Sequence, residues 1–216
     1  MSKKETAKRY VLAAMGVLIM GIGVAATTRA ELGVSPISSV ANIMSIKIDA
    51  ISLGNWLFMW NMLLLVGQML ILRKKFNPIQ FLQVPISILF GSFTDIGVKL
   101  WNYVPMPNYA AQMVMVIGGM VILSIGITMC VTANVIMNSG EAFVKAISDT
   151  THKDFGMLKV VFDVCCVVMA VLLSLLFFGT IVGTREGTII LAVLTGFTVK
   201  LLSKFLAAPI EKFAKA

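Results

Sequence analysis

Residues 10–28 of the chain read YVLAAMGVLIMGIGVAATT, a run of 19 residues without a charged side chain. A helix rises about 1.5 Å per residue, so roughly 20 apolar residues cross the 30 Å hydrocarbon core of a bilayer. Basic residues precede the run, as they do in a signal peptide, but a typical signal core has only about 7–15 apolar residues. We therefore interpret residues 10–28 as a retained first membrane span.

The composition of the whole chain agrees with this interpretation. Hydrophobic residues make up 58% of the 216 positions and charged residues 13%. Soluble proteins average about 45–50% and about 25%, respectively. The mean hydropathy is +0.94. These values exclude a water-soluble domain, a disordered chain and a protein that binds nucleic acid.

Five further apolar stretches are long enough to span a bilayer. They cover about residues 54–72, 79–101, 109–132, 157–178 and 187–206. The sequence therefore predicts an all-α membrane protein with six transmembrane helices.

The positions of the basic residues predict the orientation. With the N-terminus in the cytoplasm, 14 of the 18 Lys and Arg residues fall on that side, and Arg29, Lys47, Lys99 and Arg185 fall on the other. Cytoplasmic loops carry an excess of Lys and Arg. We expect a multi-pass protein of the cell membrane with both termini in the cytoplasm.

Two further segments, about residues 35–46 and 140–149, are apolar but too short to cross. Such segments form either re-entrant or interfacial helices, and the sequence leaves both alternatives open.

The two halves of the chain resemble each other. Residues 30–45 (AELGVSPISSVANIMS) correspond to residues 133–148 (ANVIMNSGEAFVKAIS), and two further pairs of stretches follow, at offsets of 103, 102 and 105 residues. We expect a first repeat over residues 1–104 and a second over 105–216. Each repeat contains three spans, an odd number, so the second enters the membrane from the opposite side. Inverted repeats of this kind are common in transporters, which bind their substrate where the repeats meet.

The starts of the two short helices are therefore candidate parts of a binding site. Helix N-termini carry partial positive charge and unpaired amide groups, which favour polar or anionic ligands. The candidate residues at these starts are Ser35, Ser38, Ser39, Asn138 and Ser139. Alternatively, Pro36 and the serines only begin two interfacial helices.

Several of these motifs resemble a known family. The stretch GVSPISS at residues 33–39, an amide at Asn61 in the second span and the G-x-x-x-D motif from Gly91 to Asp95 are similar to the YczE/YyaS/YitT family of bacterial integral membrane proteins. The resemblance implies a bacterial membrane protein with the outline of a transporter and indicates no substrate. In the family motif the acidic position falls on Ser38, whereas Glu141 keeps the acid in the second half. The family's acid in the fifth span falls on Asp163, after Lys159.

Ionisable residues within the spans are further candidates, because a charge at the bilayer centre costs about 3 kcal/mol. Asp95 and Lys99 are four residues apart, as are Lys159 and Asp163, so each pair shares a helix face and can form an ion pair. Asp95, Asp163 and then Glu141 are candidates for proton or cation coupling, since burial raises a carboxyl pKa. For each of them, a purely structural pairing or capping role remains the alternative. Asn61 can hydrogen-bond between helices.

We expect a secondary transporter of a small polar or anionic solute. The alternatives are a substrate-binding membrane subunit of a larger importer and a membrane assembly factor that transports nothing. An enzyme is not expected, because no metal cluster, nucleophile–base pair or phosphate loop occurs, and no cofactor or metal is implied. The expected partners are membrane lipid and the solute, with no nucleic acid, while coupling to a proton or cation and a homodimer are left open.

Overall fold

The computed structural model describes residues 3–215, which form eight α-helices and no strand. Two 3-10 turns, η1 (Arg73–Lys75) and η2 (Pro78–Leu82), connect α3 to α4. The helices are α1 (Lys3–Arg29), α2 (Pro36–Lys47), α3 (Leu53–Leu72), α4 (Gln83–Trp101), α5 (Tyr109–Ala133), α6 (Ser139–Thr151), α7 (Phe155–Phe178) and α8 (Glu186–Lys215).

The six helices other than α2 and α6 are long and apolar enough to cross a membrane. This confirms the prediction of an all-helical chain with six such helices. The ends differ most at α1, which begins at Lys3, and at α8, which continues past Pro209 to Lys215. Hydropathy marks only the apolar part of a helix, whereas the helical backbone of both elements continues into more polar sequence.

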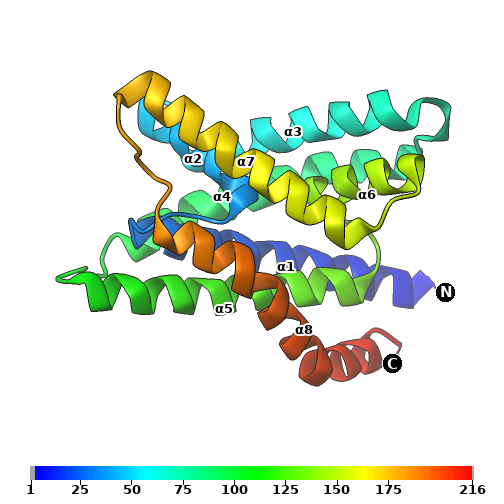
Figure 1. Cartoon of the computed structure of the whole chain (residues 1–216). Helices are drawn as coiled ribbons and strands as arrows, with labels where there is room; N and C mark the ends of the chain where they lie inside the picture. The colour runs from blue at the N-terminus through cyan, green and yellow to red at the C-terminus, as the bar shows by residue number, and fades with distance from the viewer. Residues whose placement is uncertain (1–2, 216) are drawn as a thin grey trace.

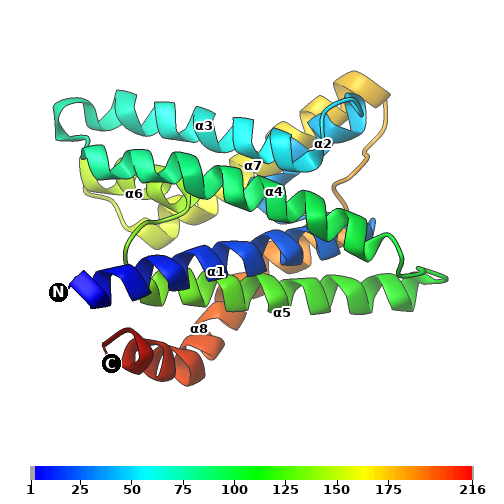
Figure 2. The ribbon, with the colours of Figure 1, turned by 180° about the vertical axis from the view of Figure 1, so that it is seen from behind.

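α1 and α5 pack against each other along their length and run antiparallel (Figure 1). α4 packs on α1, α8 packs on α5, and α3 packs on α4, as the view from behind also shows for α1, α3, α4 and α5 (Figure 2). Both ends of the described chain lie at the same end of the bundle, as an even number of crossings requires (Figure 1).

The α1–α5 contact depends on glycine. A Cβ atom added to Gly16 would lie 2.8 Å from the carbonyl oxygen of Gly126, and one added to Gly23 would lie 3.0 Å from the carbonyl oxygen of Gly119. Small residues at such contacts let helix backbones approach closely in a membrane.

α3 and α4 also meet through glycines. A Cβ atom added to Gly91 would lie 3.0 Å from the carbonyl carbon of Gly54. In the second half of the chain the arrangement differs, because α7 packs on α2 and α6 and does not pack along α8.

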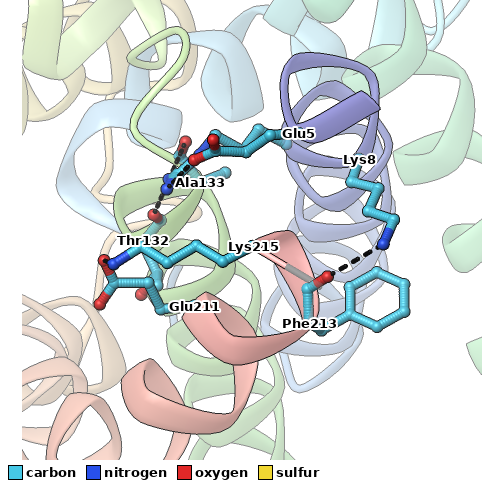
Figure 3. Close-up of polar contacts among 8 residues, drawn as sticks. Glu5, Lys8, Thr132, Ala133, Glu211, Phe213 and Lys215 are labelled. Carbon is cyan, nitrogen blue, oxygen red and sulfur yellow. Dashed lines mark hydrogen bonds and ion pairs between the residues drawn. The ribbon is translucent and has the colours of Figure 1, made fainter. Parts of the chain in front are cut away.

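A polar cluster joins α1, α5 and α8 at the end that holds both termini (Figure 3). Arg9 pairs with Glu5 at 2.9 Å and donates to the carbonyl oxygens of Thr132 and Ala133, at 3.4 and 3.2 Å. These are among the last carbonyls of α5, which lack partners within the helix. Lys8 donates to the carbonyl oxygen of Phe213, which holds the end of α8 beside α1.

The short helices α2 and α6 begin beside each other. Their N-caps are Ser35 and Asn138, and a Cβ atom added to Gly140 would lie 2.6 Å from Cδ1 of Ile37. From this meeting point the two helices run toward opposite ends of the bundle, as both views show (Figures 1 and 2).

Candidate functional site

A cavity of about 410 Å³ lies where α2 and α6 begin. Seven of the ten side chains predicted for the site line it, namely Ser35, Ser38, Asn61, Asn138, Glu141, Lys159 and Asp163. They come from α2, α3, α6, α7 and the caps of the short helices. The structure thus brings together residues that are distant in the sequence.

The rest of the wall is largely apolar, and each of the six long helices contributes to it. α1, α3, α4, α5 and α8 supply the side chains of Met20, Val24, Leu57, Trp60, Phe90, Leu123, Ile127, Leu191 and Val199. The cavity therefore combines a small polar region with an apolar surround, as ligand sites in proteins commonly do.

Lys159 and Asp163 form the ion pair that their spacing predicts. The Lys159 ammonium donates to both carboxylate oxygens of Asp163, each at 2.5 Å. The two charges therefore neutralise each other within one face of α7.

Glu141 is the carboxyl group of the cavity that has no such partner. Among residues 3–215, its Oε2 atom is shielded from solvent and has no hydrogen-bond partner, whereas Asn138 and the Glu141 amide interact with the carboxyl group. Burial raises the pKa of this carboxyl above its ordinary value, while the nearby Lys159 acts in the opposite direction. An unpaired buried acceptor is costly, so the site gains stability when a donor reaches Oε2.

Three other polar groups at the cavity also lack partners. Asn61 is only 2% exposed, and its side chain makes no hydrogen bond to any part of the chain that the structure describes. The indole nitrogen of Trp60 and the hydroxyl of Thr195 are likewise buried and unpaired. These groups can donate to or accept from a polar ligand.

Several first-turn amides of the two short helices are already engaged. Ser38 N–H donates to the carbonyl oxygen of Ser35 at 2.9 Å, and Pro36 has no N–H. In α6, Ser139 N–H donates to Oδ1 of Asn138, and Ala142 N–H donates to its carbonyl oxygen, both at 2.9 Å. These bonds reduce the number of amides that can hold an anion.

Ser39 and Ser139 lie beside the cavity but do not line it. The hydroxyl of Ser39 donates to the carbonyl oxygen of Pro36 at 2.6 Å and lies 3.3 Å from that of Cys166, so it joins α2 to α7. The carbonyl oxygen of Ser139 accepts a hydrogen bond from Gln68 of α3.

The structure places Asp95 away from the cavity. Its carboxylate accepts hydrogen bonds from the Ser52 hydroxyl at 2.6 Å and from Gly54 N–H at 2.8 Å, at the start of α3. Within residues 3–215, the expected ion pair with Lys99 does not form. Asp95 thus connects α4 to the unpaired amides at the start of α3.

Sequence reasoning missed Trp60 and Thr195. Both lie in stretches that correspond between the two halves, residues 54–61 with 156–163 and residues 90–95 with 195–200. In these pairings Trp60 precedes Asn61, the counterpart of Asp163, and Thr195 is the counterpart of Phe90, which also lines the cavity. The correspondence between the two halves of the sequence could therefore have identified both residues as candidates.

Residues 3–215 form eight helices, of which six are long and apolar enough to span a bilayer, and these helices surround a cavity with buried polar groups. These features define the class as a multi-pass helical membrane protein. Residues 7–204 match a family of unknown function (DUF6198), and the chain belongs to this family.

A segment of 96 residues is 27% identical to the uncharacterized protein YyaS of Bacillus subtilis (strain 168). The match covers 44% of this chain and 44% of that relative, so it spans less than half of either protein. Together, the two matches confirm the family resemblance drawn from the sequence motifs. No solved structure matches the chain.

Proposed function

We propose that this protein is a secondary transporter of a small polar solute, which binds in the cavity between α2 and α6. The observation that carries the proposal is the meeting of the two short helices at a buried, partly unsatisfied polar site. In transporters with inverted repeats, discontinuous or short helices meet in this way near the middle of the bilayer.

The glycine contacts between α1 and α5 support an inverted repeat. Gly16 and Gly119 are 103 positions apart, and so are Gly23 and Gly126. Gly16 contacts Gly126 and Gly23 contacts Gly119. Gly16 thus meets the equivalent of Gly23, and Gly23 meets the equivalent of Gly16. A two-fold axis between the repeats produces this crossed pairing.

The short helices obey the same offset. Their N-caps, Ser35 and Asn138, are 103 positions apart, and so are Ile37 and Gly140, which contact each other. Two equivalent residues touch only beside a two-fold axis. The packing of α2 on α7 is likewise matched by that of α3 on α6. These contacts support two re-entrant helices that enter from opposite sides, with the cavity next to the axis.

Coupling to a proton or another cation is assigned to Glu141 and Asp163, because both carboxyl groups line the cavity. Asp95 is not included, since its hydrogen bonds hold α3 to α4.

The proposal is tested by access to the cavity from both sides of the membrane. Asn61→Cys is introduced into a chain whose three cysteines are replaced by alanine, and oriented vesicles are treated with a membrane-impermeant methanethiosulfonate. A transporter exposes its site to each side in turn. We therefore expect Cys at position 61 to react from both sides.

Gly118→Cys is the matched control, because a Cβ atom at this position of α5 would have no neighbour within 4 Å among residues 3–215 beyond its own helical turn. A cysteine that faces lipid should react from neither side. Reaction at position 61 from one side only would instead favour a substrate-binding subunit or an assembly factor, and no reaction at all would refute the proposed carrier.

A further inference from the structure

The cavity opens sideways between α7 and α8. Val160 of α7 and Val193 of α8 both line it, yet they are 63% and 68% exposed on the outer surface of the bundle. Gly196, which also lines the cavity, has no neighbour within 4 Å of an added Cβ atom. Because α7 and α8 are candidate membrane spans, this opening faces the acyl chains of the bilayer.

α7 and α8 stay apart where their counterparts in the first half touch. In the first half, α3 and α4 touch at Gly54 and Gly91. In the corresponding stretches of the second half, Gly156 and Gly196 take the places of these glycines, yet α7 does not pack along α8 in the part of the chain that the structure describes. Asp95, which bonds α4 to α3, corresponds to Lys200, which cannot accept that hydrogen bond. The opening lies where the α3–α4 contact has no counterpart.

The rim and the interior of this opening differ in polarity. The exposed side chains of Val160 and Val193 form apolar parts of its rim, whereas Asn61 and the Oε2 atom of Glu141 are buried inside. An acyl chain packs well against the valines, but a fully polar solute loses its hydration there without compensation. A molecule that fills both regions has a polar head and an apolar chain.

The charges of the interior select the head group. Asp163 already neutralises Lys159, the cationic side chain of the cavity, and the Ser38 and Ser139 amides at the starts of α2 and α6 are engaged. The Glu141 Oε2 atom has no donor. The rings of Trp60 and Phe90 line the same space, and aromatic faces attract cations. The head group that fits is an ammonium.

We propose that the solute is a single-chain amphipathic amine, which enters the cavity from the bilayer between α7 and α8 with its ammonium group toward Glu141. This inference rests on the proposed transport function, since it uses the same cavity, but its test does not require transport.

The test uses the fluorescence of Trp60 in lipid nanodiscs. Trp56 and Trp101 are replaced by phenylalanine, and the protein is titrated with dodecylamine that carries bromine on its chain, because bromine quenches a nearby indole. We expect quenching that saturates at a low mole fraction of the amine and decreases at least threefold in Glu141→Gln. Brominated dodecanoate, which has the opposite charge, should quench only in proportion to its concentration in the bilayer.

Gly196→Phe places a ring in the opening and should abolish the saturable component. Ile189→Phe is its control, because Ile189 is exposed on α8 and does not line the cavity. Equal quenching by amine and carboxylate, or saturation that Gly196→Phe leaves unchanged, overturns the inference. A disulfide-linked dimer of Val193→Cys in the cysteine-free chain also overturns the inference, because a second copy of the protein would then cover the opening.

The two proposals fail in distinguishable ways. If Asn61→Cys reacts from both sides but the quenching does not saturate, the protein is a transporter whose solute enters the cavity from water. If the quenching saturates but Asn61→Cys reacts from one side only, the protein binds the amine without transporting it.

Discussion

At the scale of single residues, Asp95 and Asp163 have opposite surroundings, although both were candidates on the same grounds. Each carboxylate has a lysine four residues away. Asp163 pairs with its lysine at the cavity, whereas Asp95 bonds to Ser52 and Gly54 at the start of α3. Sequence spacing shows which partners a carboxylate can reach along its own helix, but it does not show a partner on another helix.

Asp95→Asn should therefore reduce stability. The variant loses charge-assisted hydrogen bonds to the start of α3, and we expect a cost of about 2 kcal/mol. Thermal unfolding in detergent measures it. Lys99→Ala is the control and should change stability by less than about 0.5 kcal/mol, as an exposed residue without a partner does. If Lys99→Ala destabilised the protein as much as Asp95→Asn, a pair between the two residues would be supported instead.

Glu141 should make stability depend on pH. Its pKa is raised in the folded state by burial, so folding favours the protonated form, and this stabilisation is lost as the pH rises through the raised pKa. The groups that face Glu141 are Lys159 and Asp163 on α7 and the Cys130 thiol on α5. We expect the melting temperature to decrease from acidic to neutral pH, and this decrease to become smaller in Glu141→Gln. A pH profile identical in the two proteins would show that another group is responsible.

At the scale of helices, the α1–α5 contact leaves no room for side chains at its glycines. A Cβ atom added to Gly126 would lie 2.6 Å from Cγ of Met20. We expect Gly126→Ala to destabilise the protein by about 1–3 kcal/mol through overpacking, measured by thermal unfolding in detergent. Gly118→Ala, on the open side of the same helix, should be neutral or stabilise by up to about 1 kcal/mol, because alanine favours the helix. Similar losses from both variants would contradict a close crossing.

Hydropathy predicted the boundaries of some helices more accurately than those of others. The middle helices α3 and α5 end within one residue of the predicted spans. α8 extends nine residues further than expected, to Lys215, because Lys8 of α1 and the end of α8 contact each other. Hydropathy indicates whether a residue prefers lipid or water. It does not indicate the tertiary contacts that extend a helix at its end.

At the scale of the whole molecule, the meeting of the two short helices can be tested by crosslinking. In the cysteine-free chain, Ile37→Cys and Gly140→Cys together should form a disulfide with copper phenanthroline, because these positions are in contact. The altered mobility of the crosslinked protein on a gel reports the reaction. Ile37→Cys with Gly118→Cys is the control pair and should not react. If the first pair forms no disulfide although each single cysteine is reactive, the starts of the two helices are not in contact, and the proposed site does not exist.

Much of the candidate site was accessible from the sequence, because polar residues are rare in apolar spans and each one needs a reason. This argument selected Asn61, Glu141, Lys159 and Asp163, which line one cavity. It could not exclude Asp95, and it passed over Trp60 and Thr195, whose side chains fit a membrane span without any special role.

By itself, the sequence determined that this is a helical protein with six apolar spans and two shorter segments, because the length and hydropathy of a run are local properties. Only the tertiary structure decided which polar side chains share the cavity and that α7 and α8 leave it open. A span that is apolar on every side carries no periodicity to show which face packs inward. That choice depends on contacts between distant residues, such as Gly16 with Gly126 and Ile37 with Gly140.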